Sequence, residues 1–165
     1  MAFAVGDRIA HPMHGAGVIA GIEKRKTNGQ ELEYYVLKLP VGGMLVMIPT
    51  ATSDVIGVRP IIGHDEAEDI LNSIPYIEIN MTQNWNKRYR ENMIKIKSGD
   101  LMEVATVVKG LMKRDSDRGL STGERKMLHS AKQILISEIV LSQSSSYEEI
   151  EYRLVSAMNI TVETA

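Results

Sequence analysis

The sequence predicts an α+β chain of two domains: a small Tudor/SH3-like β-barrel followed by an all-α helical domain. Two observations support this fold class. Short β-branched or aromatic runs fill the first third, whereas from about residue 64 apolar residues recur at spacings of three and four. Pro60 and Gly63 interrupt the chain between these patterns. We therefore place the first domain at residues 1–60 and the second at 64–165.

The first domain contains four runs with strand character, separated by turn residues. They are residues 5–11, 15–25, 33–39 and 44–49. Asn28 and Gly29 predict a two-residue hairpin between the second and third runs, because both positions tolerate a positive φ. Short strands with many glycines favour a strongly bent barrel, which limits exposed strand edges. A barrel of this kind is typical of a binding module.

The second domain contains five runs with helical periodicity. They are residues 65–74, 86–96, 100–114, 122–141 and 147–158. Three helix starts match a capping box, in which side chains satisfy the unpaired backbone donors of the first turn. The pairs are Asp100 with Glu103, Ser121 with Glu124, and Ser146 with Glu149. Gly99 and Gly119 are expected to end the preceding helices.

Composition excludes several classes of protein. The 165 residues are 44% hydrophobic and 24% charged, ordinary values for a folded globular chain. The N-terminus lacks a basic start followed by an apolar run, and no uncharged apolar stretch could span a membrane. We expect a cytoplasmic protein without a membrane partner. The absence of cysteine excludes a disulfide framework and a thiol nucleophile.

The net charge of −2 conceals a basic middle segment. Residues 1–75 and 131–165 each carry a net charge of −3, whereas residues 76–130 carry 11 Lys and Arg against 7 Asp and Glu, a net charge of +4. This pattern indicates a face for a polyanion, with a solvated helix surface as the other interpretation.

Three sequence patterns resemble catalytic or metal-binding motifs, but the residues around each of them do not match the motif. The glycines of residues 15–21 precede another strand, whereas a phosphate-binding loop must open onto a helix. His11 and His14 have no further ligand at a diagnostic spacing. Asp115 and Asp117 resemble the start of a calcium loop, but glycine falls at the wrong position, so we expect a connection between helices there. We expect no cofactor and no metal, and an enzyme is the least supported class.

The only tryptophan, Trp85, stands among cations. If a helix begins near Asn84, steps of 100° per residue divide its side chains into two faces. One face holds Trp85, Tyr89, Met93 and Ile96, and the other holds Lys87, Arg90 and Lys97. Trp85 is at the mouth of this helix, and composition leaves two interpretations open: a core residue or an exposed recognition residue.

Three segments resemble the CarD/CdnL family of bacterial transcription regulators. They are VGDRIAHPMHGAGVIAGIEKR at 5–25, NWNKRYREN at 84–92 and RDSDRGLSTGERKMLHSAKQIL at 114–135, in order along nearly the whole chain. The resemblance implies an N-terminal domain that binds the β subunit of RNA polymerase and a helical domain that contacts promoter DNA. In this family a tryptophan acts as a wedge at the upstream edge of the transcription bubble and stabilises the open complex.

Carried onto this sequence, the resemblance implies two sets of binding residues and a monomer. The DNA-binding set is Trp85, Lys87, Arg88, Arg90, Arg125 and Lys126. The polymerase-binding set is Arg25, Met47 and Pro49. Some family members carry arginine where this chain has Met47, so the contact there would be apolar. An alternative is that Met47 points into the barrel core.

Two other functions stay open from the sequence. A free-standing, sequence-nonspecific DNA-binding protein would use the same basic segment and would bind DNA tightly without polymerase. A Tudor-like reader of modified peptides would need an aromatic cage, for which Tyr34, Tyr35 and Phe3 are the candidates.

Overall fold

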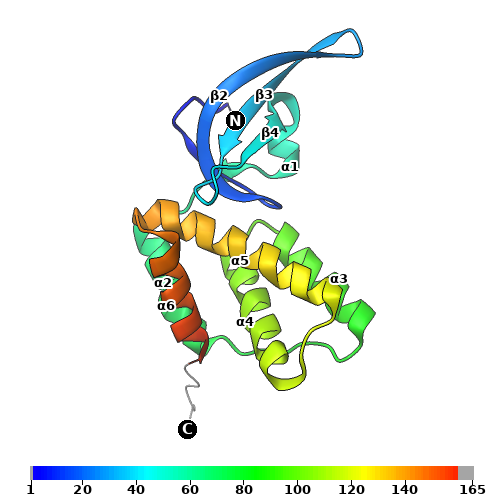
Figure 1. The fold of residues 1–165 in the computed structure, drawn as a ribbon, viewed down its shortest axis with the longest axis vertical. Helices are drawn as coiled ribbons and strands as arrows, with labels where there is room; N and C mark the ends of the chain where they lie inside the picture. Colours follow the sequence, from blue (N-terminus) through cyan, green and yellow to red (C-terminus); the bar gives the residue numbers. More distant parts are fainter. Residues whose placement is uncertain (1, 160–165) are drawn as a thin grey trace.

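A computed structural model describes residues 2–159, and it divides into a β-sheet region followed by a helical region. Figure 1 shows the sheet at the upper end of the molecule and the helices below it, with α5 running along the boundary. The α+β fold class is confirmed, with an antiparallel N-terminal sheet of the expected Tudor-like kind.

The sheet is built from five strands in the order β4-β3-β2-β1-β5, with antiparallel neighbours throughout. The strands are β1 Arg8–His11, β2 Gly15–Thr27, β3 Gln30–Lys38, β4 Leu45–Pro49 and β5 Arg59–Pro60. The hairpin between β2 and β3 has positive φ at Asn28 (53°) and Gly29 (78°), as the sequence predicts. A 3₁₀ turn, η1 Thr50–Thr52, and a short helix, α1 Ser53–Ile56, connect β4 to β5.

One face of the bent sheet forms a small core. Ile9, Ile19, Leu37 and Ile48 are almost fully buried there, and the core also includes Phe3, Tyr35 and Val58. The pairing of β2 with β3 shifts register between Ile19 and Gly21, and such a bulge increases the local twist. The sheet therefore curves around this core.

The five expected helices are confirmed. They are α2 His64–Ser73, α3 Trp85–Lys97, α4 Leu101–Arg118, α5 Thr122–Gln143 and α6 Tyr147–Asn159, with a 3₁₀ turn, η2 Ile74–Tyr76, after α2. One expectation is wrong. Asp115 and Asp117 lie in the last turn of α4 and not in a connection, because the helix continues to Gly119, where φ is 79°. In the described part of the chain, no helix is long and apolar enough to cross a membrane.

The predicted N-caps form at α4, α5 and α6. Asp100 Oδ1 accepts the N–H of Met102 at 2.9 Å, and the Oγ atoms of Ser121 and Ser146 accept the N–H groups of Glu124 and Glu149, both at 3.2 Å. The side chains of two of the predicted capping-box glutamates take other partners. Glu149 accepts a hydrogen bond from Ser145, and Glu124 turns into the protein interior.

The helical core lies between α4 and α5. Its fully buried side chains include Val107, Val108, Leu111, Leu135 and Ile139. On one side of this pair, α2 and α6 run next to each other (Figure 1), joined by a fork in which Arg153 donates to both carboxylate oxygens of Glu68 at 2.7 and 3.1 Å. On the other side α3 packs against α4, which places the first turn of α3 near the start of α5.

The sheet packs onto α5. The N–H of Ala16 donates to Ser137 Oγ at 2.9 Å, and Arg8 Nη1 donates to the carbonyl of Leu141 at 2.6 Å. Gly15 lies so close to α5 that a Cβ at this position would lie 2.5 Å from Ser137 Oγ, and its φ of 90° also favours glycine. The two regions therefore share a close-packed boundary.

Candidate nucleic-acid interface

The N-terminal ends of α3 and α5 meet at Trp85. Asn84 caps α3 by accepting the N–H of Lys87 at 3.0 Å, so Trp85 is the first helical residue, as predicted. Its indole Nε1 donates to the Oγ of Ser121, the N-cap of α5, at 3.0 Å. The tryptophan is thereby attached to the N-cap of a second helix, 36 residues further along the chain.

The Trp85 side chain is fixed but accessible. The residue is 42% exposed, and its ring stacks on Tyr89 with centroids 5.1 Å apart and planes at 19°. A Cβ at Gly123 would lie 3.5 Å from its Cζ2 atom, so the ring also lies against the first turn of α5. Trp85 is not a core residue, whereas Tyr89 and Met93 pack partly and Ile96 packs fully in the helical core.

The hydroxyl of Ser121 serves both helices. It accepts hydrogen bonds from the Trp85 indole and from the N–H of Glu124, and it donates to Glu124 Oε1 at 3.3 Å. A serine hydroxyl has one proton and two lone pairs, so these three contacts use its full capacity. Any change that rotates Ser121 would affect the helix cap and the indole together.

Arg88 does not lie on the exposed basic surface, contrary to the expectation that it holds phosphate. It is 1% exposed, and its Nε and Nη2 donate to the two carboxylate oxygens of Glu124 at 2.9 and 3.1 Å. Its Nη1 donates to the carbonyls of Thr82 and Gln83 at 3.2 and 2.9 Å. Arg88 therefore joins α3, the segment before it and α5 beneath Trp85.

Glu124 stays ionised despite its burial. Burial disfavours the carboxylate, but the hydrogen bonds and charge of Arg88, together with Arg114 and Ser121, outweigh it and hold the pKa of Glu124 below its usual value. A buried ion pair of this kind is directional, and removing one partner leaves an uncompensated charge. The pair fixes how the ends of α3 and α5 meet.

The other predicted cations are exposed around this point. Lys87 and Arg90 lie on the solvent face of α3, with Lys97 further along it, as the helical spacing predicts. Arg125 and Lys126 are exposed in the early part of α5. The Arg125 side chain is 63% exposed, and its contacts are long: 3.5 Å to the Leu120 carbonyl and 3.8 Å to Asp115. Its guanidinium can turn toward a phosphate at little cost.

The three residues assigned to polymerase share the outer face of the sheet. In the observed register Met47 and Pro49 pair with Val36 and Tyr34, and Arg25 pairs with Leu32. Paired residues lie on one face, and residues two apart along a strand share it. Arg25, Met47 and Pro49 therefore lie on one face, along β2 and the edge strand β4.

The register also decides the orientation of Met47. Ile48 and Val46 point to the sheet core, so Met47, between them, points away from it. The aromatic cage is not formed, because Tyr34 and Tyr35 point to opposite faces. Tyr35 is buried in the core, where its ring meets Phe3 edge-on and its hydroxyl accepts the N–H of Phe3.

Comparison with known proteins identifies the family. The model of the CarD C-terminal domain matches residues 69–155, and that of the CarD-like/TRCF RID domain matches residues 3–62. The chain is 34% identical over 149 residues to "Putative transcription factor YdeB" of Bacillus subtilis (strain 168), which covers 90% of this chain and 97% of that protein. The chain belongs to the CarD family. The family points to a transcription factor that interacts with RNA polymerase, which confirms the resemblance seen in the sequence.

In this CarD-family protein the sequence indicated most of the exposed residues of the candidate interface but missed the buried residues beneath them. Arg88 and Asn92 precede Ile96 at four-residue spacing, so all three share the buried face of α3. That spacing could have shown that Arg88 points inward. Nothing in the sequence identifies Glu124 as its partner or Ser121 as the acceptor for Trp85.

The structure offers this CarD-family protein no metal site among residues 2–159, where no three His, Cys, Asp or Glu side chains gather. The rings of His11 and His14 lie 4.5 Å apart, and His11 Nδ1 accepts the N–H of Met13 at 3.0 Å. Burial and the nearby His14 lower the pKa of His11 from 6.5 to about 4.

Proposed function

We propose that this CarD-family protein binds the β subunit of RNA polymerase through its N-terminal domain and stabilises the open promoter complex through Trp85. The indole is the wedge, placed at the upstream edge of the transcription bubble. The observation that carries this proposal is a large aromatic side chain held half-exposed at the junction of two helix N-termini. The protein would act as a monomer in the cytoplasm, where polymerase and promoter DNA are found.

The energetics suit a wedge. Separating bases at the fork costs a few kcal/mol per step, and stacking on an aromatic side chain returns roughly 1–3 kcal/mol per base. The Trp85 ring is already oriented by Ser121 and Tyr89, so less rotamer freedom is lost when it meets a base. Stacking of this kind acts in the open state and therefore slows closure.

The exposed cations would hold the phosphates beside the wedge. Lys87, Arg90, Arg125 and Lys126 supply sequence-independent attraction and register. The N-terminal ends of α3 and α5 add the positive ends of two helix dipoles. Arg88 would support this surface from inside and would not contact DNA.

The outer face of the sheet would bind the polymerase. Arg25, Met47 and Pro49 lie on it, and the exposed Leu45 extends it along β4. Because β4 is an edge strand, its unpaired backbone groups can also pair with a strand of the partner. Binding there would raise the local concentration of promoter DNA, so weak DNA contacts suffice.

A free-standing DNA-binding protein is the second candidate, because the exposed cations need no polymerase to attract DNA. The test compares three measurements on the purified chain. If the proposal is correct, the protein binds isolated DNA weakly, binds the polymerase β subunit, and lengthens the lifetime of competitor-challenged open complexes. Tight DNA binding together with an unchanged lifetime would support the second candidate instead.

A further inference from the structure

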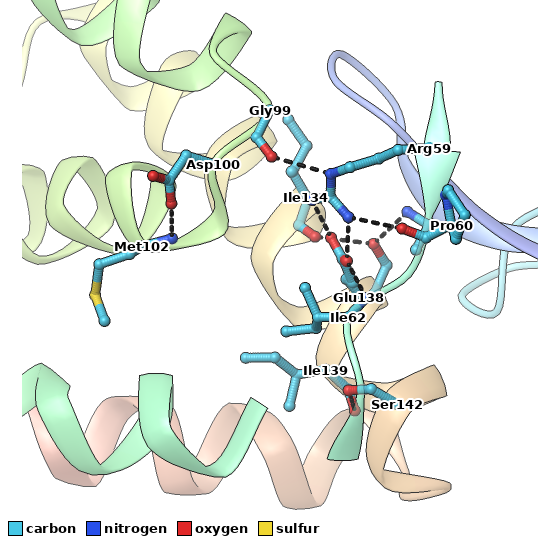
Figure 2. A network of polar contacts seen from close by, with 12 residues as sticks. Arg59, Pro60, Ile62, Gly99, Asp100, Met102, Ile134, Glu138, Ile139 and Ser142 are labelled. Carbon is cyan, nitrogen blue, oxygen red and sulfur yellow. Dashed lines mark hydrogen bonds and ion pairs between the residues drawn. The ribbon is translucent and has the colours of Figure 1, made fainter. Parts of the chain in front are cut away.

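The sheet and the helical region are joined by a partly buried ion pair (Figure 2). Arg59 of β5 donates from Nη1 and Nη2 to the two carboxylate oxygens of Glu138, in α5, at 2.6 and 2.9 Å. The Glu138 side chain is 2% exposed and that of Arg59 is 31% exposed. A two-pronged contact between a planar guanidinium and a carboxylate fixes orientation as well as distance.

Other segments converge on the same two side chains. The N–H of Ile62, in the segment between β5 and α2, donates to Glu138 Oε2 at 2.9 Å. Arg59 Nε donates to the carbonyl of Gly99, the middle residue of the three between α3 and α4, at 3.1 Å. Figure 2 shows these contacts meeting around the guanidinium and the carboxylate. Arg59 thereby links the sheet to α5 and to the end of α3.

The contact with Gly99 attaches Arg59 to the junction of α3 and α4. Gly99 lies between Ser98, the C-cap of α3, and Asp100, the N-cap of α4. α3 ends at Lys97, and Gly99 follows with a φ of 77°. Arg59 is therefore placed at one end of α3 and Trp85 at the other, about 20 Å away along 13 residues.

We infer that Arg59 is a positioning residue for the wedge: its joint with Glu138 and Gly99 fixes α3 relative to the polymerase-binding sheet. The inference rests on the proposed function. A loose tether would raise the local concentration of Trp85 near the promoter, whereas a fixed joint also aims the indole at one base step. The contacts of Arg8 with Leu141 and of Ala16 with Ser137 hold the sheet to α5, and Arg59 extends the attachment to α3.

Arg59→Lys tests the joint, because lysine keeps the charge but cannot form the fork. Glu138→Gln is the second variant, and it removes the charge while retaining an acceptor. Arg153→Lys is the matched control, since Arg153 makes the same kind of fork with Glu68 inside the helical region. Thermal unfolding of each variant would establish that it is folded before the joint is examined.

The geometry can be measured directly because the chain has no cysteine. Spin labels at Glu31→Cys in β3 and Ile94→Cys in α3, both exposed positions, report the distance between the sheet and α3. We expect one narrow distance distribution in the parent and in Arg153→Lys. Arg59→Lys and Glu138→Gln should broaden it.

The functional measurement uses unlabelled full-length protein and open-complex decay under competitor challenge. Arg59→Lys should shorten the open-complex lifetime by about tenfold, and by no more than Trp85→Ala does. The affinities for the β subunit and for isolated DNA should be retained.

Unchanged distances in both joint variants would overturn the inference, as would broadened distances with an unchanged lifetime. Parallel losses of β-subunit affinity and lifetime would show a merely structural role. If the parent protein itself fails to prolong open complexes, the proposed function is wrong, and the role in aiming Trp85 falls with it.

Discussion

The indole Nε1 of Trp85 donates a 3.0 Å hydrogen bond to the Oγ of Ser121, the residue that caps α5. The same oxygen accepts the N–H of Glu124, whose carboxylate binds the buried Arg88. An exposed aromatic ring is thus connected in two steps to a buried ion pair. This connection explains how a large side chain can stay half-exposed and still keep one orientation.

Trp85→Ala should have little effect on the free energy of unfolding but a large effect on the lifetime of open complexes. The variant loses one hydrogen bond and part of an aromatic stack, so its free energy of unfolding should fall by only about 1–2 kcal/mol. A core tryptophan would cost about 3–5 kcal/mol. If stacking on a base is worth roughly 1–3 kcal/mol, the open-complex lifetime should fall by about fivefold to 150-fold. Trp85→Phe should restore part of it. A folded Trp85→Ala protein with the parent's effect on lifetime would disprove the wedge.

Ser121→Ala should lower both the stability of the protein, through the lost helix cap, and the lifetime of open complexes. Removing an N-cap hydroxyl costs about 1 kcal/mol of stability, and here it also frees the indole. Ser146→Ala is the control, because Ser146 caps α6 in the same way but the structure places no tryptophan on it. Chemical denaturation should give a somewhat larger loss for Ser121→Ala, because Ser121 Oγ also binds the Trp85 indole and the Glu124 carboxylate. Only Ser121→Ala should shorten the lifetime of open complexes, and equal lifetimes would argue that the indole needs no such anchor.

Replacing the exposed arginines should weaken DNA binding, whereas replacing the buried Arg88 should lower stability. Arg90→Ala and Arg125→Ala should weaken DNA binding about equally across sequences and reduce the salt slope by roughly one unit per lost phosphate contact. Arg88→Ala should instead lower the free energy of unfolding by about 3–5 kcal/mol, since Glu124 would remain buried without its partner. Salt titrations of DNA binding and denaturation curves distinguish these outcomes. An unchanged slope in both surface variants would mean that their charges are only solvated.

Stability should fall as the pH drops from about 6.5 to about 4, in part because of His11. Folding lowers its pKa from 6.5 to about 4, chiefly through burial and then through His14, so the unfolded chain binds more protons in this window. The stability that the lowered pKa of His11 contributes is fully present above about pH 6.5 and is lost toward pH 4. His11→Asn should flatten the slope of unfolding free energy against pH relative to the parent, since the amide oxygen can replace Nδ1 as acceptor for Met13.

Separating the two domains should show which of them binds the polymerase β subunit. We expect residues 1–60 to retain binding to the β subunit and residues 64–165 to fold as a helical unit. The cut removes Arg59 and Ile62 from Glu138, but it also exposes that carboxylate to water, which limits the destabilisation. A mixture of the two fragments should not prolong open complexes as the intact chain does. A folded 1–60 fragment without affinity for the β subunit would show that the division is wrong.

The sequence by itself determined the features that depend on neighbouring residues. The Asn28-Gly29 hairpin, the caps at Asp100, Ser121 and Ser146, and the two faces of α3 follow from hydrogen bonds and periodicity within a few residues. Family resemblance in residues 5–25, 84–92 and 114–135 indicated the binding residues, and the family itself is confirmed.

Only the tertiary structure decided which partner each buried charged side chain has. Arg88 pairs with a carboxylate 36 residues away, and Arg59 with one 79 residues away. Such pairs form because packed helices and strands bring the groups together, and the low dielectric of the interior then requires each buried charge to have a partner. Side-chain type and spacing cannot specify that partner. The accessible Trp85, its anchor at Ser121 and the outward direction of Met47 are decided in the same way, by how α3, α5 and the strands pack and pair.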